Sequence, residues 1–295
     1  MIYTVTLNPS VDYSMHPASL CEGGINRSEY EFHTFGGKGI NVSAMLSALG
    51  TENVALGFVG GFSGHEIERL ATRAGVSCDF CEITDTSRIN VKVLYKTETA
   101  INGKGPFIRL EEEDDLLRKL GLLSSDDTVI LSGSAPESES GCLLENVIDA
   151  ASHTRFIADM EGQALLSAIE KKPFLIKPNE DELAALFGKK SLSEGEIAAA
   201  ARELRERGVR NVLVSRGGEG ALLAAEDGSL YKIRAPKVEV VSTVGAGDSF
   251  LAGFVAGYDR GFEFALALAT AAGSATAAND GIADGAAVMA VFAGM

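Results

Sequence analysis

The chain has 295 residues, of which 46% are hydrophobic and 23% charged, and it contains no tryptophan. This length suits one large α/β domain with a small additional element, or two ordinary domains. The net charge is −15, and the 41 acidic residues are spread along the sequence. Such a surface repels polyanions, which argues against nucleic acid and acidic membranes as partners, so an anionic substrate needs local basic residues.

Cysteines are few, and no segment is typical of export or of a membrane anchor. Cys78 and Cys81 have the spacing of a zinc knuckle, but no second Cys or His pair follows at ligand distance. We therefore expect free thiols in a reducing cytosol. Residues 1–9 lack the basic start of a signal peptide, and the alanine-rich run at 264–278 is too short to span a bilayer. A cytoplasmic protein is expected.

The first element is a short apolar run at residues 2–7, ended by Asn8-Pro9, which predicts a buried strand. It leads to Asp12, and an aspartate in such a position is usually a turn former. Residues 27–35 and 88–95, the latter continued at 99–107, alternate apolar with polar side chains. These runs predict strands with two unlike faces, as in a small sheet lying over another part of the molecule.

Gly36-Gly37-Lys38-Gly39 precedes an amphipathic helix at residues 40–49, which Gly50 ends. The loop is not a Walker A motif, because the lysine is followed by glycine rather than by Ser or Thr. Adjacent glycines let the backbone approach a ligand closely, and Asn41 can both donate to and accept from hydroxyl groups. The loop and Asn41 are therefore candidates for binding a polyhydroxylated ligand.

The middle of the chain alternates predicted strands with predicted helices. Strands are expected at residues 53–59, 128–131, 155–158, 174–176 and 211–215, and helices at 64–74, 139–151 and 163–169. This alternation indicates right-handed crossovers and a mostly parallel sheet with helices on both faces. Ligands in such folds bind at the carboxyl ends of the strands.

Two of these strands end in polar segments. Lys177-Pro178-Asn179-Glu180-Asp181-Glu182 follows residue 176, and it places Asn179 and Glu182 on one face of a first helical turn. An ordinary N-capped helix with an acidic first turn explains the same composition. A glycine-rich loop at residues 216–220 follows the strand that ends at Ser215.

Residues 242–257 read S-T-V-G-A-G-D-S-F-L-A-G-F-V-A-G and follow a β-branched run at 238–241, which predicts a strand, a tight turn and a closely packed helix. The backbone amides of Gly245, Ala246 and Gly247 then point outward from a helix N-terminus, where they can bind phosphate. Asp248 in the same turn can take a proton from an attacking hydroxyl. Alternatively, Asp248 only caps the helix. A Gly-Asp-Ser hydrolase with Ser249 as nucleophile is disfavoured, because all four histidines precede that serine.

This last segment resembles the second signature of the PfkB family of ribokinase-like carbohydrate kinases, and residues 36–42, G-G-K-G-I-N-V, resemble the first. The resemblance extends over nearly the whole chain. It implies one ribokinase-like α/β domain over residues 1–295, with a mostly parallel sheet, helices on both faces and a small β-lid from insertions at about 12–35 and 86–108. A homodimer formed through the lid is expected, since pairing would cover its exposed face.

The resemblance also implies roles for individual residues. Asp248 is expected to be the general base beside the amides of Gly245, Ala246 and Gly247. The residues expected to bind the substrate are Asp12, Arg27, Gly37, Lys38, Asn41, Arg88 and Asn90. Lys38, Arg27 and Arg88 supply positive charge for a phosphate that the substrate already carries, and arginine forks suit phosphate oxygens. Solvated charges on edge strands are the alternative for Arg27 and Arg88.

For the nucleotide, the resemblance implies ATP and Mg²⁺. The residues expected at the cofactor are Lys177, Asn179, Ser215, Gly218, Gly220, Thr243 and Asn279. Glu182 is expected to hold Mg²⁺ through water, which suits an ion that keeps most of its hydration shell.

Together these features predict an ATP-dependent kinase of the phosphosugar branch of the family. The expected reaction is fructose 1-phosphate to fructose 1,6-bisphosphate, with tagatose 6-phosphate as the alternative substrate. A catalytically silent sugar-phosphate sensor on the same fold is a more distant alternative.

Overall fold

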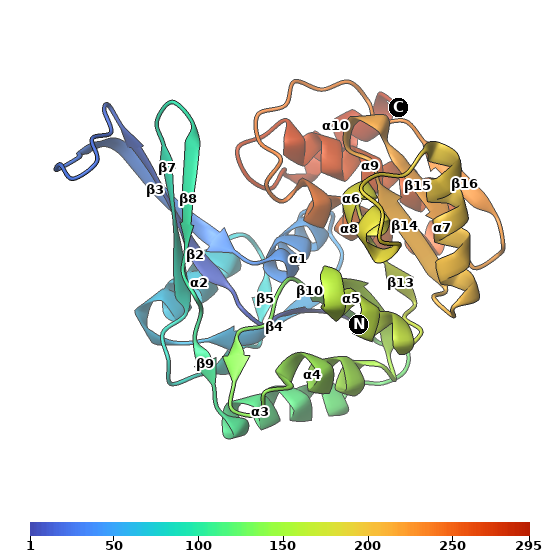
Figure 1. Cartoon of the computed structure of the whole chain (residues 1–295), viewed down its shortest axis with the longest axis horizontal. Helices are drawn as coiled ribbons and strands as arrows, with labels where there is room; N and C mark the ends of the chain where they lie inside the picture. Colours follow the sequence, from blue (N-terminus) through green and yellow to red (C-terminus); the bar gives the residue numbers. More distant parts are fainter.

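The computed structural model describes residues 1–295. The molecule is built around a ten-stranded sheet (Figure 1). The strands along its main path follow the order β16-β15-β14-β13-β12-β10-β1-β4-β5, and β6 also pairs with β4. Their bounds are β1 Ile2–Thr6, β4 Asn53–Val59, β5 Ser77–Cys78, β6 Cys81–Glu82, β10 Thr128–Ser132, β12 Arg155–Asp159, β13 Leu175–Ile176, β14 Asn211–Ser215, β15 Ala221–Ala224 and β16 Leu230–Ile233. All neighbours pair in parallel except those involving β15 and β16, which confirms the predicted α/β class.

Ten helices pack around this sheet (Figure 1). Their bounds are α1 Lys38–Ala48, α2 Gly61–Arg73, α3 Leu110–Gly121, α4 Leu143–Ala151, α5 Gly162–Glu170, α6 Glu180–Leu186, α7 Glu194–Glu206, α8 Ala246–Gly257, α9 Phe262–Ala277 and α10 Gly285–Ala293. Alternate strand residues enter two cores: Val212 and Val214 belong to the cluster that includes side chains of α3, α4, α5 and α7, whereas Leu213 belongs to the cluster that includes side chains of α1, α8, α9 and α10. The sheet is therefore covered on both faces, as its near-continuous apolar strands require.

A separate four-stranded sheet projects from the body of the molecule (Figure 1). Its order is β3-β2-β7-β8, with bounds β2 Ser10–Pro17, β3 Ser28–Gly36, β7 Arg88–Leu94 and β8 Glu98–Asn102. We call this sheet the β-lid. The expected continuation of its second segment to residue 107 is wrong, because Phe107–Ile108 (β9) pairs instead with Glu137–Ser138 (β11).

The strand predicted at residues 238–241 is also absent. Val240 and Val241 are 60% and 62% exposed, and Val241 makes a single backbone bond, from its N–H to the carbonyl of Ala277 at the end of α9. β-branched residues favour a strand only where a neighbouring strand supplies a ladder, and β16 already ends at Ile233. No helix of this fold combines the length and apolar character needed to cross a membrane.

The helix predicted after this segment is confirmed as α8, and it packs closely against α9. A Cβ atom placed on Gly253 would lie 2.7 Å from the carbonyl oxygen of Leu268 and 2.8 Å from the Cα of Ala269. The missing side chain therefore lets the two backbones meet. This contact fixes α8, whose N-terminus faces the cavity described next.

Candidate active site

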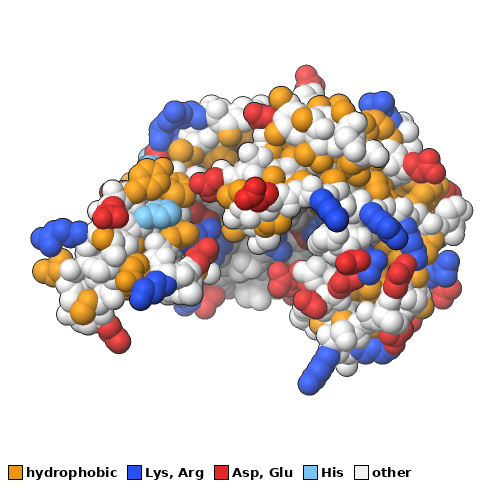
Figure 2. Space-filling model, turned by 90° about the horizontal axis from the view of Figure 1, so that it is seen from above, with side chains coloured by type: hydrophobic (Ala, Val, Ile, Leu, Met, Phe, Trp, Pro, Cys, Tyr) orange, Lys and Arg blue, Asp and Glu red, His pale blue; other side chains and the backbone are white.

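A cavity of about 760 Å³ opens at the carboxyl ends of the parallel strands. Five of its lining residues end or directly follow neighbouring strands of the central sheet: Thr6, Ser132, Asp159, Lys177 and Ser215. The β-lid forms another part of the wall. In Figure 2 this region is seen as a hollow between raised parts of the molecule, with acidic and basic side chains on its rim. Its place agrees with the general rule for ligand sites in α/β folds.

Asp248 lies in this cavity, in the first turn of α8. Gly245 precedes the helix with a left-handed φ of 75°, a conformation that favours glycine. The turn presents Gly245, Gly247 and Asp248 to the cavity, while Ala246 faces a smaller adjoining pocket. The Asp248 side chain is buried and makes no cap hydrogen bond, so it is not used to cap the helix.

Asn41 holds the Asp248 carboxylate in place. Its Nδ2 donates a hydrogen bond of 2.8 Å to Oδ2 of Asp248. Burial raises the pKa of Asp248 to about 6, and the Asp159 carboxylate adds to the rise, whereas the Asn41 bond and the Lys177 and Lys38 charges oppose it. At neutral pH the group is therefore mostly ionised, but it is more basic than an ordinary aspartate.

Asp159 and Lys177 form a buried ion pair beside this turn. Their side chains are 3% and 7% exposed, and Lys177 Nζ lies 3.2 Å from Asp159 Oδ1. The other oxygen, Oδ2, is buried without a hydrogen-bond partner in the protein. The sequence analysis missed Asp159, although its place at the carboxyl end of a predicted strand was the available signal.

Lys38 reaches across the cavity from the start of α1. Its Nζ donates to Oε1 of Glu161, the residue before α5, over 3.2 Å. Burial alone would lower the pKa of Lys38, but the nearby carboxylates of Asp159, Glu161 and Asp248 outweigh burial and raise it. Lys38 is therefore cationic and lies among the acidic residues near Asp248, and Glu161 is a further residue that the sequence analysis did not assign.

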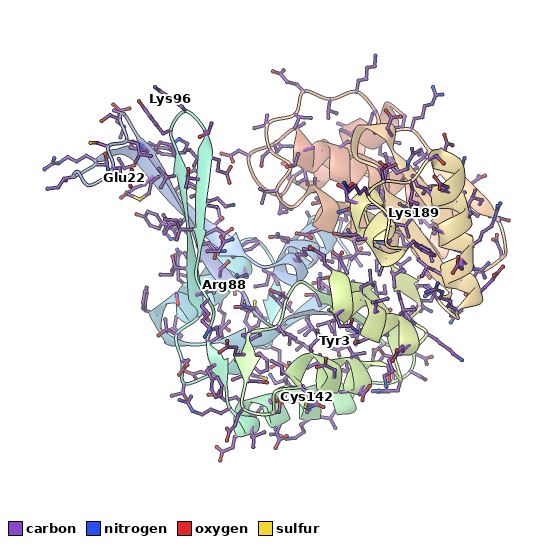
Figure 3. The ribbon with its side chains drawn as sticks, in the orientation of Figure 1. Tyr3, Glu22, Arg88, Lys96, Cys142 and Lys189 are labelled. Atoms are coloured by element: carbon purple, nitrogen blue, oxygen red, sulfur yellow. The ribbon has the colours of Figure 1, made fainter.

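The base of the β-lid supplies the opposite part of the wall, through Asp12, Arg88 and Asn90. Asp12 Oδ1 accepts hydrogen bonds of 2.7 Å from Ser10 and 2.9 Å from Asn90. The Arg88 Nε donates to the backbone oxygen of Asn8, and burial lowers the pKa of Arg88. Figure 3 shows Arg88 at the base of the lid, where the lid joins the body.

Arg27 lies elsewhere. It is exposed in the segment between β2 and β3, and it lines a shallow surface pocket with Met15 and Tyr30 rather than the main cavity. Within one chain the structure therefore does not bring Arg27 together with Lys38 and Arg88.

Asn179 and Glu182 both line the cavity and also cap α6. Asn179 Oδ1 accepts from the backbone N–H of Glu182 over 2.8 Å, and Glu182 Oε2 accepts from the backbone N–H of Asn179 over 2.9 Å. Burial raises the pKa of Glu182. The capping interpretation of this pair is thus correct for the fold, and the Oε1 oxygen of Glu182 and the Nδ2 of Asn179 are left for other partners.

A second pocket of about 270 Å³ adjoins the main cavity. Ser215, Thr243 and Gly247 line both, while Gly218, Gly220, Val238 and Val240 line only the smaller one. Its narrow, largely apolar shape suits a flat heterocycle. Asn279 is not part of its wall and donates instead to the carbonyl oxygen of Ala275. Lys177 lines the main cavity alone.

Ser249 faces away from both pockets. Its side chain is fully buried, and its Oγ accepts a hydrogen bond of 2.8 Å from Thr276. A role as the nucleophile of a hydrolase is therefore ruled out by its position.

Comparison with known proteins gives one consistent family. The pattern of the pfkB family carbohydrate kinases matches residues 5–287. The chain is 43% identical over 256 residues to 1-phosphofructokinase of Bacillus subtilis, covering 86% of this chain and 84% of that protein. It is 40% identical over 257 residues to D-tagatose-1-phosphate kinase of Bacillus licheniformis, with 86% and 84% covered. The tetrameric inhibited form of phosphofructokinase-2 from Escherichia coli superimposes with a TM-score of 0.89 at 28% identity, covering 99% of this chain and 98% of that one.

Proposed function

The chain belongs to the pfkB family of carbohydrate kinases and is a phosphotransferase with an alcohol group as acceptor, and we propose that it phosphorylates fructose 1-phosphate with ATP. The product is fructose 1,6-bisphosphate. The observation that carries this proposal is the position of Asp248 and the α8 N-terminus where the cavity walled by the β-lid meets the narrow pocket.

The two compartments suit the two substrates. We expect the narrow pocket to receive the adenine, near Gly218, Gly220 and Val238, and the phosphates to lie over the α8 N-terminus, because Gly247 lines both compartments. The larger cavity receives the sugar, with Asp12, Asn90 and Asn41 available to its hydroxyl groups. Backbone amides at a helix N-terminus and lysine side chains stabilise charge on a transferring phosphoryl group.

Transfer needs one proton acceptor and no covalent intermediate. Asp248 removes the proton of the 6-hydroxyl group as that oxygen attacks the γ-phosphorus. The bond between the γ-phosphorus and its bridging oxygen breaks, and ADP leaves with the electron pair. Lys38 and Lys177, which both raise the ionised fraction of Asp248, are also placed to balance the charge of the phosphates.

The acidic residues fit a hydrated Mg²⁺ better than a directly coordinated metal. No group of three or more His, Cys, Asp or Glu side chains converges as a metal-binding set. The free Oε1 of Glu182 and the unpartnered Oδ2 of Asp159 can accept hydrogen bonds from water bound to an ion held by the phosphates. Such an ion, when bound, neutralises phosphate charge.

The sugar is tested by a panel. ADP release is measured with fructose 1-phosphate, tagatose 6-phosphate, tagatose 1-phosphate and fructose 6-phosphate, for the wild type and for Asp248→Asn. We expect the largest kcat/KM with fructose 1-phosphate and its loss in the variant. A preference for tagatose 6-phosphate would favour the alternative substrate. Binding of a phosphosugar without sugar-dependent ADP release would favour the sensor.

We also propose that two copies pair through the β-lid. His16, Tyr30 and Phe32 form a partly exposed aromatic cluster, with ring centroids 5.5 to 6.0 Å apart, and their strand register places them on the lid face that carries Asp12. A second lid would cover this cluster. It would also give Arg27 a role, since a residue outside its own cavity can reach a phosphosugar only in a neighbouring copy. The tetrameric phosphofructokinase-2 shows that a protein of this fold can assemble.

Sedimentation tests the pairing. Phe32→Asp is expected to yield monomers, whereas Ile101→Asp, on the opposite face of the lid, leaves the assembly unchanged. A monomeric wild type at micromolar concentration would contradict the proposal.

A further inference from the structure

Lys92 lies next to the proposed sugar site and takes no part in the proposed phosphoryl transfer. Strand register places Ser10, Asp12 and Ser14 of β2 opposite Arg88, Asn90 and Lys92 of β7, so that these side chains share one face of the lid. Successive members of each set are about 6.7 Å apart along the strand. Lys92 is thus one step farther from the lid base than Asn90, and it lines an adjoining cavity of about 430 Å³ together with Asp12 and Asn41.

Lys92 is the partner of one oxygen of Asp12. Its Nζ lies 3.4 Å from Oδ2, and the two side chains are 20% and 16% exposed. The other oxygen already accepts from Ser10 and Asn90. The oxygen that remains for a sugar hydroxyl is therefore the one that Lys92 neutralises.

The balance of charges around the main cavity explains why the Lys92–Asp12 pair matters for an anionic substrate. Five carboxylates line the cavity against three cationic side chains. The carboxylates are Asp12, Asp159, Glu161, Glu182 and Asp248, and the cations are Lys38, Arg88 and Lys177. Asp159 and Glu161 pair with Lys177 and Lys38. On the lid, Arg88 alone would only balance Asp12, and a phosphosugar would meet a face without net charge. Lys92 makes the part of that face next to the cavity, from Arg88 to Lys92, net positive.

We infer that Lys92 determines specificity for phosphorylated over unphosphorylated sugars, by cancelling the charge of Asp12 so that this carboxylate can bind a hydroxyl without repelling the phosphate. The inference rests on the proposed function and deepens it. A neutral sugar gains little from Lys92, because it carries no charge for Asp12 to repel. An anionic sugar depends on it, since repulsion between an uncancelled Asp12 carboxylate and the sugar phosphate is only weakly screened in a partly buried site.

The experiment compares a phosphosugar with its neutral counterpart. For Lys92→Met, the KM for fructose 1-phosphate should rise roughly tenfold, which corresponds to about 1.4 kcal/mol. The inhibition constant of unphosphorylated fructose, measured as a competitor in the same assay, should change by less than about twofold on the same scale. The KM for ATP should stay constant.

Two variants serve as controls. Lys92→Arg keeps the charge and should retain most of the affinity for fructose 1-phosphate. Lys96→Met removes a lysine at the tip of the same hairpin, far from Arg88 at its base (Figure 3), and should alter neither constant.

Each outcome decides the point. Equal loss of affinity for fructose and fructose 1-phosphate in Lys92→Met would show that Lys92 only maintains the lid, and no loss for either would show that it is dispensable. Both results overturn the inference while the proposed function stands. A wild type that phosphorylates no phosphosugar would overturn the proposed function, and the inference with it.

Discussion

Asn41 and Asp248 are separated by 207 residues in the chain, yet the Asn41 Nδ2 lies 2.8 Å from the Asp248 Oδ2. The bond joins α1 to α8, and so joins the two sequence signatures through the one side chain that performs the proton transfer in the proposed reaction. An amide donor favours the ionised carboxylate and fixes its orientation. The expected contact between Asn41 and the sugar is compatible with this role, since the amide oxygen remains available.

The activity of the wild type should fall in mild acid. Because the pKa of Asp248 is raised to about 6, the fraction that can accept a proton decreases below that pH. The value of kcat/KM for the sugar is expected to drop about tenfold for each pH unit below this point. A profile measured at saturating ATP, with the fold checked by circular dichroism, gives the comparison. A flat profile down to pH 5 would contradict Asp248 as the base.

Removal of the Asn41 donor should shift the acid limb of this pH profile, which is the fall in kcat/KM at low pH. In Asn41→Leu the hydrogen bond to the carboxylate is lost, so the pKa of Asp248 rises further and the acid limb shifts to higher pH, by about one unit for a bond of average strength. Asn90→Leu removes an amide from the lid side of the same cavity and should weaken sugar binding without moving the limb. An unshifted limb in Asn41→Leu would mean that Asn41 does not act on Asp248.

Asp248→Asn should separate activity from stability. Turnover should fall by about 10² to 10⁴ or more, as is usual when a general base is removed. Since the folded-state pKa of about 6 exceeds the ordinary aspartate pKa of 3.8, the folded protein binds the proton more tightly than the unfolded chain. The resulting stability is present below pH 3.8 and is lost as the pH rises through 6.

Asparagine cannot ionise, so Asp248→Asn loses no stability from this position as the pH rises from 3.8 through about 6. At pH 8 the variant should therefore have a larger free energy of unfolding than the wild type, by up to about 3 kcal/mol, as measured by chemical denaturation. This difference should shrink at pH 4. If the wild type and the variant were equally stable at pH 8 and also at pH 4, burial would not disfavour the charged form of Asp248.

Much of the fold and half of the site could be predicted because they depend on local patterns. The apolar run of residues 211–215 forms β14, and alternating residues at 88–95 form β7 in a separate sheet. Asp248 and Asn41 could be singled out from the chemistry of their two glycine-containing motifs, whereas the role of Lys38 followed from the resemblance to the PfkB family. The strand predicted from Val240, Val241 and their neighbours was wrong, since a β-branched run also needs a partner strand, and the presence of that partner is not a local property.

The remaining site residues depend on contacts between distant segments. Glu161 reaches Lys38 across 123 residues, and nothing near Glu161 in the sequence indicates that partner. Lys92 reads as one more polar residue of an alternating strand until the register places it beside Asp12. Arg27 lies outside the main cavity of its own chain, and its expected contact with the substrate phosphate stays a prediction that depends on the proposed pairing of two copies.

The contact between α8 and α9 can be tested with one chemical change at two positions. In Gly253→Ala the new Cβ would lie 2.7 Å from the Leu268 carbonyl oxygen and 2.8 Å from the Ala269 Cα, so one of the two backbones must move. We expect a loss of about 1 to 3 kcal/mol in the free energy of unfolding, and reduced kcat because α8 carries Asp248. Gly195→Ala, where nothing lies within 4 Å of the added methyl group, should instead stabilise α7 slightly, by up to about 1 kcal/mol. Chemical denaturation measures the change in the free energy of unfolding for both variants, which should have opposite signs. A stabilised Gly253→Ala would show that α8 and α9 leave room for a methyl group at this contact.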